Sequence, residues 1–487
     1  MLDQSLLKNK YDVIIIGSGI GGLICGCYLA KAGFRVLIVE QHSAPGGCCT
    51  SFSRKGFIFD VGVHYLGSLR EEGILRKVIN ELDLSAQMDF IRTDPTDRII
   101  MPDKTIFIRQ DKNRTKEELA LNFPHEKDNI IRFFDFICKT DFFTKVSKTK
   151  TMTFNKMLDI FFKDYKIKST LSVLLGNIGL PPSRASALAS IILFEEYIFD
   201  GGYYPRGGMQ TFVNLIAAKF EQYGGALLLS TKVTNIIIKE KKVTGVKIED
   251  EKSVFSEFVV SNSDATFTFN TLLDCETEEK RVVKKLNCST SAFVIYLGLN
   301  KKISINPKHY TTWRFFTYDI EKCYGSGLNL TETNEPSYIL CTFSSLNDST
   351  LAPKNKSAIR VLIWANFKSK SDCHSNKHNI CDKMMEKVEL IIPNINECVE
   401  VKEVATPRTF YRFTLNKNGA IYGWSAETNQ IDKNVFPSKT TIDNLYLTGH
   451  WVTKGVGQSS VSLVALCGRN TAKSIIRKRN HECISHT

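Results

Sequence analysis

The stretch that decides the fold is Tyr11-Asp-Val-Ile-Ile-Ile-Gly-Ser-Gly-Ile-Gly-Gly22, close to the start of the chain. Its apolar, β-branched residues up to Ile16 predict a buried strand, and a helical pattern then runs through Ala32. A strand, a glycine-rich turn and a helix in this order are typical of the βαβ unit that binds dinucleotides. The stretch therefore predicts an α/β fold that starts with such a unit.

Each glycine of the turn has a physical role in such a unit. Gly17 permits the tight turn, Gly19 lets the backbone approach a pyrophosphate, and Gly22 lets the helix pack close to the strand. Gly21 lies at the start of the helix, where free N–H groups favour an anion. A glycine-rich turn that binds no ligand is the alternative that this motif alone leaves open.

An acidic residue follows at the distance that the motif requires. Residues 34–40 predict a second buried strand, which ends at Glu40, 18 residues after Gly22. A carboxylate at this position accepts hydrogen bonds from a ribose 2′-hydroxyl and repels a 2′-phosphate, which argues against NADP. Gln41, the next residue, is a further candidate contact to the nucleotide.

Three features favour FAD over NAD as the cofactor. The fingerprint lies at the N-terminal end of the sequence, and a second glycine pair, Gly46-Gly47, follows the ribose acid within seven residues. A second strand, glycine turn and helix occupy residues 445–466. There Gly449, Gly455 and Gly457 could bring backbone N–H groups to the flavin end of a long cofactor, which NAD would not need.

Composition limits the remaining classes. The chain has 487 residues, of which 43% are hydrophobic and 24% charged, as in ordinary globular proteins. The formal net charge is +13, but the sequence has no zinc finger, RNA-binding signature or arginine-rich stripe, so no nucleic-acid partner is expected. The fourteen cysteines include no C-x-x-C pair, which argues against a metal site and a redox dithiol.

The pattern along the chain predicts a β/α core with two inserts. Residues 1–69, 203–265 and 435–487 are expected to form an FAD-binding, Rossmann-like domain. Residues 70–202, which look helical, aromatic and basic, and residues 266–434 are expected to form a mixed α+β substrate-binding or lid domain. Glycines interrupt the apolar run from Val13 to Ala30, so neither a signal peptide nor a membrane span is predicted, and a cytoplasmic location is expected.

Several longer segments resemble a known family. They are Glu40-Gln-His-Ser-Ala-Pro-Gly-Gly-Cys-Cys-Thr50, Gly56-Phe-Ile-Phe-Asp60, Gly62-Val-His-Tyr-Leu-Gly67, Tyr204-Pro-Arg-Gly-Gly-Met-Gln210, Thr406-Pro-Arg-Thr-Phe410, Asn418-Gly-Ala-Ile-Tyr-Gly423 and Asn444-Leu-Tyr-Leu-Thr-Gly-His450. Together they resemble the flavoenzyme family of retinol saturase, carotenoid isomerase and phytoene desaturase. The resemblance extends from residue 11 to about residue 475, with diffuse stretches at 70–200 and 266–400.

The resemblance implies a non-covalently bound FAD and a long, apolar polyene substrate. It places the ADP moiety on the first glycine turn and Glu40, the pyrophosphate near Gly46-Gly47, and the adenine side against the backbone of Val233. Residues from Gly449 to Val461 would cover the ribityl chain and the isoalloxazine ring. His450 departs from the family, because many relatives have an acidic residue there, which puts that contact in doubt.

Chemistry at carbon–carbon double bonds needs a hydride carrier, which flavin N5 supplies, and a group that exchanges a proton. The candidates are His64, Tyr65 and Tyr204, with Glu195 and Glu196 also open. A buried structural role for His64 and a solvated helix face for the two glutamates are the alternatives. The reaction would be saturation, desaturation or cis–trans isomerisation. Electrons would pass to or from a transient nicotinamide, a quinone or another carrier, because no second dinucleotide fingerprint is present.

The segment 139–168 combines eight lysines with phenylalanines. Because polyenes reside in lipid, this segment is interpreted as a contact with the membrane surface, which would make the protein peripheral to the membrane. The alternative is a helical lid whose phenylalanines line a substrate tunnel.

Two other functions stay open on the sequence. One is a flavin amine oxidase, for which an aromatic cage that includes Tyr203 and Tyr204 would be expected. The other is an escort protein that keeps the fold but has lost flavin, against which the intact fingerprint and Glu40 argue.

Overall fold

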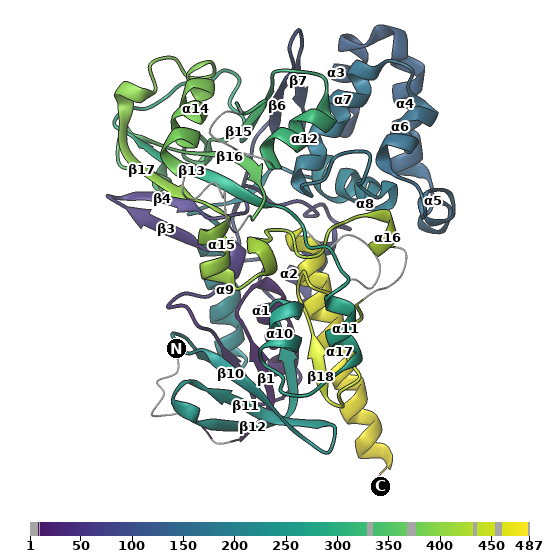
Figure 1. The fold of residues 1–487 in the computed structure, drawn as a ribbon, viewed down its shortest axis with the longest axis vertical. Coiled ribbons are helices and arrows are strands. Elements are labelled where there is room, and N and C mark those ends of the chain that lie inside the picture. The colour runs from purple at the N-terminus through teal and green to yellow at the C-terminus, as the bar shows by residue number, and fades with distance from the viewer. Residues whose placement is uncertain are drawn as a thin grey trace.

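Two seven-stranded sheets organise the chain. The computed structural model describes residues 8, 10–328, 335–367, 376–431, 436–452 and 460–485. The sheet that contains β1 lies in the lower part of Figure 1, and the second sheet lies in the upper part. The predicted α/β class is confirmed.

The first sheet begins with the predicted dinucleotide-binding unit. Its strands, in spatial order, are β10 (Val233–Lys239), β11 (Lys242–Ile248), β12 (Ser253–Ser261), β1 (Lys10–Ile16), β2 (Val36–Val39) and β9 (Ala226–Leu228), with β18 (Leu445–Leu447) against β12. β1, β2, β9, β12 and β18 run parallel, whereas β10 and β11 form an antiparallel hairpin.

Both faces of this sheet are covered. Val13 and Ile15 of β1 belong to one buried cluster, and Ile14 and Ile16 belong to another on the opposite face. Strands that are buried on both faces are typical of parallel sheets with helices on either side. The apolar run from Val13 to Ala30 is therefore the end of a central strand of this sheet, the glycine turn and most of the helix Ile20–Lys31.

Three helices cover the face of the sheet to which Val13 points. They are α1 (Ile20–Lys31), α9 (Met209–Gln222) and α17 (Val461–Ser485). α1 and α17 approach so closely that a Cβ on Gly468 of α17 would lie 2.4 Å from the carbonyl oxygen of Gly21. The last helix of the chain therefore packs on the first one through glycine.

The second sheet is mostly antiparallel. Its strands, in spatial order, are β17 (Val399–Ala405), β13 (Ser291–Leu299), β16 (Ser357–Ala365), β15 (Tyr338–Thr342), β14 (Thr311–Phe315), β6 (Asp97–Ile100) and β7 (Thr105–Ile108). We expected residues 70–200 to be helical, but β6 and β7 come from this segment and extend the sheet, with β6 parallel to β14. Four-residue strands are too short to show a distinct periodicity beside longer helices.

The remaining elements surround these sheets. Two antiparallel two-stranded sheets pair β3 (Ser51–Arg54) with β4 (Phe57–Asp60) and β5 (Phe90–Arg92) with β8 (Tyr203–Pro205). The helices beside the second sheet on the right of Figure 1 are α3 (Lys112–Asn122), α4 (Lys127–Lys139), α5 (Phe142–Thr149), α6 (Phe154–Phe161), α7 (Tyr165–Val173) and α8 (Ala187–Leu193). The others are α2 (Ile74–Glu81), α10 (Ala265–Asn270), α11 (Glu278–Val283), α12 (Ile320–Leu328), α13 (Ser344–Asn347), α14 (Lys377–Glu389), α15 (Pro407–Thr414) and α16 (Thr428–Ile431).

The predicted domain limits at residues 69, 202, 265 and 434 stay a prediction. The strands of the first sheet come from the three segments that were assigned to the FAD-binding domain. The strands of the second sheet come from the two inserts. We propose the same limits for the two domains.

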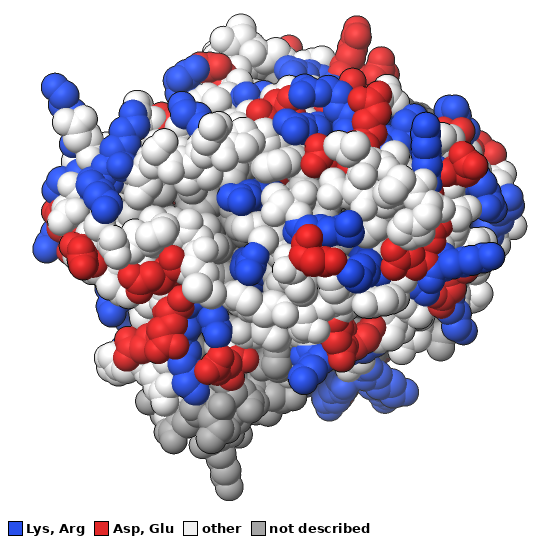
Figure 2. All heavy atoms as spheres, turned by 90° about the horizontal axis from the view of Figure 1, so that it is seen from above, with Lys and Arg blue, Asp and Glu red and all other residues white. Residues whose placement is uncertain are grey.

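The charge of the chain is spread over the visible surface. On the face seen from above, Lys and Arg side chains are interspersed with Asp and Glu side chains (Figure 2). The net charge of +13 is therefore not gathered into one continuous basic area on this face. A nucleic-acid backbone would favour such an area.

The contact between α1 and α17 gives a test of the fold. We expect Gly468→Ala to lower the free energy of unfolding by about 1–3 kcal/mol, because the added methyl group overpacks the contact with Gly21 and Cys25. Gly325→Ala in α12 is the matched control: its Cβ has nothing within 4 Å, so it should stabilise the protein by up to ~1 kcal/mol. Urea unfolding measures both variants, and equal stability of the two would contradict the proposed contact.

Candidate functional site

The candidate site lies where the parallel strands of the first sheet end. β1 ends at Ile16 before the glycine turn, β2 ends before Glu40, β12 ends before Asn262, and β18 ends just before Gly449. Because carboxyl ends of parallel strands meet at one edge, four distant segments of the chain come together there. This edge of an α/β sheet is where ligands usually bind.

A cavity of about 700 Å³ opens at this edge and continues to the second sheet. Its lining includes most of the predicted cofactor contacts: Gly17, Gly19, Gly21, Glu40, Gln41, Gly46, Gly47, Val233, Gly449, His450 and Val461. Gly22 lies behind this lining, and Gly457 lies outside the described residues. Residues predicted from both ends of the chain therefore share one cavity.

The glycines leave no room for side chains. A Cβ on Gly22 would lie 2.3 Å from the carbonyl oxygen of Gly17, and one on Gly21 would lie 2.8 Å from Cα of Gly449. A Cβ on Gly19 would meet the amide nitrogen of Asn262 at 2.9 Å. Gly17, Gly19 and Gly21 line the cavity at the start of α1, where backbone N–H groups suit a pyrophosphate, so the residues present fit the phosphate end of FAD.

The second glycine pair lies against the first turn. The N–H of Gly46 donates to the carbonyl oxygen of Ser18 at 3.0 Å, and a Cβ on Gly47 would lie 3.3 Å from Cα of Gly19. Both Gly46 (φ 128°) and Gly47 (φ 58°) have positive φ angles, which side chains disfavour. We propose that the two turns together hold the pyrophosphate.

Glu40 is fixed by the first turn itself. One carboxylate oxygen accepts hydrogen bonds from the backbone N–H and the hydroxyl of Ser18, both at 2.8 Å, and the other accepts from the N–H of His42 at 3.0 Å. The oxygen that accepts from His42 has a further lone pair that could accept from a ribose hydroxyl. We propose this role for Glu40.

Asn262 is a site residue that the sequence analysis missed. Its side-chain amide donates to the carbonyl oxygen of Gly17 at 3.3 Å, and its oxygen would lie 2.5 Å from a Cβ on Gly449. It therefore joins the two glycine turns from opposite ends of the chain. Its position directly after a buried strand was the available signal, but only the sheet order places β12 next to β1.

His450 and Gln41 lie at the two ends of the cofactor region. His450 is half-buried in the cavity wall, and desolvation there lowers its pKa to about 4, so it is neutral at physiological pH. The amide of Gln41 donates to the carbonyl oxygen of Phe413 at 3.3 Å, beside α15. Where many relatives of the resembled family have an acid, this chain therefore presents a neutral histidine.

His64 and Tyr65 line the cavity together with Tyr197. Nε2 of His64 lies 3.3 Å from the hydroxyl oxygen of Tyr197, and the rings of Tyr65 and Tyr197 stack with their centroids 4.6 Å apart. Burial and the charge of Arg360 hold the pKa of His64 well below its usual value. The histidine is therefore a neutral hydrogen-bonding group rather than a cation.

Tyr65 connects this group to a buried acid. Its hydroxyl donates to Asp97 at 2.9 Å, and the indole N–H of Trp313 donates to the other oxygen of Asp97 at 3.0 Å. Burial raises the pKa of Asp97 to about 6, although both hydrogen bonds lower it. Asp97 thus links the segment after β4 to the second sheet.

The other predicted proton donors lie elsewhere. Tyr204 donates its hydroxyl to Asp60, and neither Tyr204 nor Tyr203 is among the described residues that line the cavity. Glu196 pairs with Arg70, and Glu195 pairs with the buried Lys145. The geometry therefore favours His64 and Tyr65 over these residues as contacts to a substrate.

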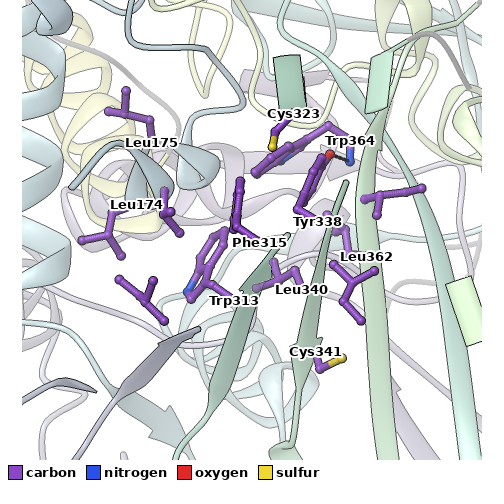
Figure 3. Close-up of a cluster of buried hydrophobic side chains, with 14 of the residues drawn as sticks. Leu174, Leu175, Trp313, Phe315, Cys323, Tyr338, Leu340, Cys341, Leu362 and Trp364 are labelled. Carbon is purple, nitrogen blue, oxygen red and sulfur yellow. Dashed lines mark hydrogen bonds between the residues drawn. The ribbon is translucent and has the colours of Figure 1, made fainter. Parts of the chain in front are cut away.

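One face of the second sheet forms the far wall of the cavity. Trp313, Leu340 and Leu362 are directly paired on β14, β15 and β16, and all three line the cavity. Figure 3 shows them beside Phe315, Tyr338 and Trp364 of the same strands, in a cluster that also contains Leu174 and Leu175. The wall opposite the nucleotide end is therefore mostly apolar.

The sequence pattern of the family "Flavin containing amine oxidoreductase" matches residues 20–476. The chain belongs to this family. Membership and the fold of its structural neighbours make it an FAD-dependent oxidoreductase. An escort protein without flavin, which the sequence left open, is not favoured by this membership.

Three relatives match over nearly the whole chain. All-trans-retinol 13,14-reductase of Danio rerio is 27% identical and covers 99% of this chain and 89% of its own. Prolycopene isomerase 2 of an Oncidium hybrid cultivar is 27% identical, with coverages of 96% and 84%. The 4,4′-diapophytoene desaturase of a Methylomonas species is 24% identical, with coverages of 97% and 96%.

Solved structures share the fold. An oxidoreductase from Methanosarcina mazei superimposes with a TM-score of 0.70 at 17% identity, covering 95% of this chain and 100% of its own. Cyclohexylamine oxidase from Brevibacterium oxydans superimposes with a TM-score of 0.66 at 12% identity, covering 96% and 99%. At these identities the likeness concerns the fold alone.

The proposed role of Glu40 can be tested by cofactor retention. We expect Glu40→Gln to weaken FAD binding about tenfold, because the amide that replaces one oxygen cannot accept a hydrogen bond and loses roughly 1–2 kcal/mol. Titration of apoprotein with FAD measures the Kd. Glu240→Gln, in the exposed turn between β10 and β11, is the control and should leave the Kd unchanged. If Glu40→Gln bound FAD with the wild-type Kd, the proposal that Glu40 binds the ribose would be wrong.

Proposed function

We propose that this enzyme acts on carbon–carbon double bonds of a carotenoid- or retinoid-like polyene. The observation that carries the proposal is the similarity over at least 96% of the chain to a retinol reductase, a prolycopene isomerase and a diapophytoene desaturase. These names describe three different reactions on conjugated chains. The proposal therefore covers saturation, desaturation and cis–trans isomerisation.

The cavity supports a long apolar substrate. Beyond the predicted nucleotide contacts it passes His64 and reaches the apolar wall of Trp313, Leu340 and Leu362. Leu193 of α8 and Ile421 add apolar surface to the same lining. Contact with such surface removes a polyene from water, which favours binding by roughly 25 cal/mol per Å² of apolar area buried.

The residues around this cavity have distinct tasks in the proposal. When bound, FAD supplies a centre at N5 that accepts or donates a hydride. The two sheets exclude water on either side of the substrate, and His64, neutral because it is buried, accepts or donates a hydrogen bond at its ring nitrogen. The stacked pair of Tyr65 and Tyr197 holds the position of that ring.

The partner that exchanges electrons belongs to the same proposal. A nicotinamide, a quinone or another carrier would have to reach the cavity transiently, since the only fingerprint found in the sequence is the one at residues 17–22. Contact with a membrane surface would serve both a quinone and a polyene, because both reside in lipid.

The main experiment is expression in cells that make a panel of carotenoids, together with assays on retinol. We expect the pigment profile, followed by chromatography, to change in chain saturation or in double-bond geometry, which separates a reductase or desaturase from an isomerase. The control is Gly21→Val, which should lose FAD because a Cβ already meets Gly449 and Asn262. An unchanged profile with FAD-loaded wild-type protein would contradict the polyene proposal.

Amine oxidation is the second candidate, favoured by the family name and by neighbours such as cyclohexylamine oxidase. Tyr203 and Tyr204, expected in an aromatic cage, are not among the described lining residues, although Tyr296 and Tyr422 are. Release of hydrogen peroxide on addition of amines, with no change in any polyene, would support this candidate instead.

The phenylalanines of the segment 139–168 are not among the described residues that line the cavity, so the tunnel-lining alternative is not favoured. Phe154 and Phe162 belong to the buried core, whereas Phe142 and Phe143 at the start of α5 are 51% and 84% exposed. No helix among the described residues is long and apolar enough to cross a membrane. We propose that the exposed end of α5 contacts the surface of an anionic membrane.

This contact predicts a defined loss of liposome binding. Wild-type protein should float with liposomes that contain anionic lipid, and Phe142→Ser with Phe143→Ser should partition at least about tenfold less, because even one phenylalanine contributes roughly 1.5–3 kcal/mol when fully buried. Leu390→Ser, at another exposed apolar residue, is the control and should behave as wild type. Recovery of wild-type protein in the unbound fraction would exclude the contact.

A further inference from the structure

A single arginine interrupts the apolar wall of the cavity. Arg360 is the fourth residue of β16, and the pairing of strands places it beside Tyr296 of β13 and Thr342 of β15. It lies two residues before Leu362, and alternate residues of a strand point to the same face. Arg360 therefore faces the cavity that Leu362 lines, and it belongs to that lining.

The guanidinium is buried with little to neutralise it. Arg360 is 6% exposed, its Nη1 donates to the carbonyl oxygen of Gly62, and its Nη2 lies 3.5 Å from the hydroxyl oxygen of Thr342. Its Nε has no hydrogen-bond partner among the described residues. Neither contact supplies a negative charge.

One acid that feels this charge is Asp60: burial raises the pKa of its carboxyl group, and the arginine opposes that rise. The carboxylate of Asp60 is already occupied: it accepts from Ser51 at 2.6 Å, from the N–H of Met209 at 3.1 Å and from the hydroxyl of Tyr204. No ion pair joins Arg360 to a carboxylate in the described part of the chain.

A buried charge without an ion-pair partner is costly, and an apolar residue of similar size would complete the wall without that cost. An arginine that lines a ligand cavity recovers this cost when the ligand brings a negative charge. We infer that Arg360 binds a negatively charged group of the molecule that occupies the cavity. Its planar guanidinium, with Nε unpaired, is suited to an anionic oxygen or to a delocalised anion.

This negative charge could come from two sources. One is the flavin ring, which gains electron density when it is reduced. The other is a carboxylate at the end of a polyene, an assignment that rests on the proposed function. In both cases the arginine attracts the charge from the side of the second sheet.

A structural role is the competing explanation. A smaller cavity of about 20 Å³ lies between Asp60, His64 and Arg360, which is enough for one water molecule. A water bridge between the arginine and Asp60 would then make Arg360 a link between β4 and β16. The experiment has to separate this link from the binding of a ligand.

The first measurement is the midpoint potential of bound FAD without substrate. If the flavin is the anionic partner, Arg360→Met should destabilise the reduced cofactor at least about tenfold, which is about 30 mV for two electrons. Arg360→Lys keeps the positive charge, so its midpoint potential should lie close to that of the wild-type protein. Arg314→Met is the matched control: Arg314, on β14, also has an unpaired Nε but is not in the described lining, so its loss should not change the potential.

The second measurement compares two polyenes that differ in one end group. Retinoic acid and retinol are titrated into the oxidised holoenzyme, and binding is followed by flavin fluorescence. If the polyene carries the charge, Arg360→Met should raise the Kd for retinoic acid at least about tenfold and leave the Kd for retinol unchanged. If neither compound binds wild-type protein, the polyene proposal fails. The midpoint potential of bound FAD then still shows whether Arg360 interacts with the flavin.

An unchanged potential together with unchanged retinoid binding in Arg360→Met would overturn the inference and leave the link to Asp60. Loss of thermal stability alone, with both readouts at wild-type values, would have the same meaning. If the methionine variant does not retain FAD, Arg360→Gln replaces it, because the amide can still donate to Gly62 while the charge is removed.

Discussion

The rest of the structure depends on the absence of side chains where four segments of the chain meet. Gly21 and Gly449 are so close that a single added carbon would lie 2.8 Å from the opposite backbone, and Asn262 fills the space between them. The parallel strands β1, β12 and β18 impose this meeting, because their ends are fixed at one edge of the sheet. A pyrophosphate that binds at the glycine turns would contact mainly backbone.

The second sheet completes the site that the first sheet begins. Its cavity-facing residues come from neighbouring strands in direct register, so Trp313, Leu340 and Leu362 form a continuous surface. The segment after β4, with His64 and Tyr65, lies between the two sheets and is tied to the second one through Asp97. Substrate chemistry is therefore expected between a backbone-lined wall and an apolar wall.

Sequence reasoning could predict the first wall because its signals are local. The change from the β-branched residues before Gly17 to a helical pattern, with Glu40 at a fixed distance, defines both the turn and the edge of the sheet. The predicted strand up to Ile16, the helix through Ala32 and the strand at 34–40 agree with the ends of β1, α1 and β2 within two residues. In each of these elements, the periodic pattern of apolar residues can be recognised within a short stretch of sequence.

The second wall could not be predicted in the same way. All nine residues of β16 are buried, and which of them face the cavity follows from pairing with β13 and β15, strands that are distant in the sequence. β6 is four residues long, and the role of Asp97 depends on its contact with Tyr65, 32 residues earlier. Contacts between residues far apart in the sequence carry no periodic signal.

The contrast between the two walls also suggests where specificity lies in this enzyme. Backbone contacts at the glycine turns depend on chain geometry, so many sequences with the same fold can hold the same cofactor. The wall formed by the second sheet consists of side chains, and each strand contributes residues that can change without disturbing the pairing. Specificity is therefore expected at positions such as His64 and Arg360 of this chain, where polar groups interrupt an apolar surface.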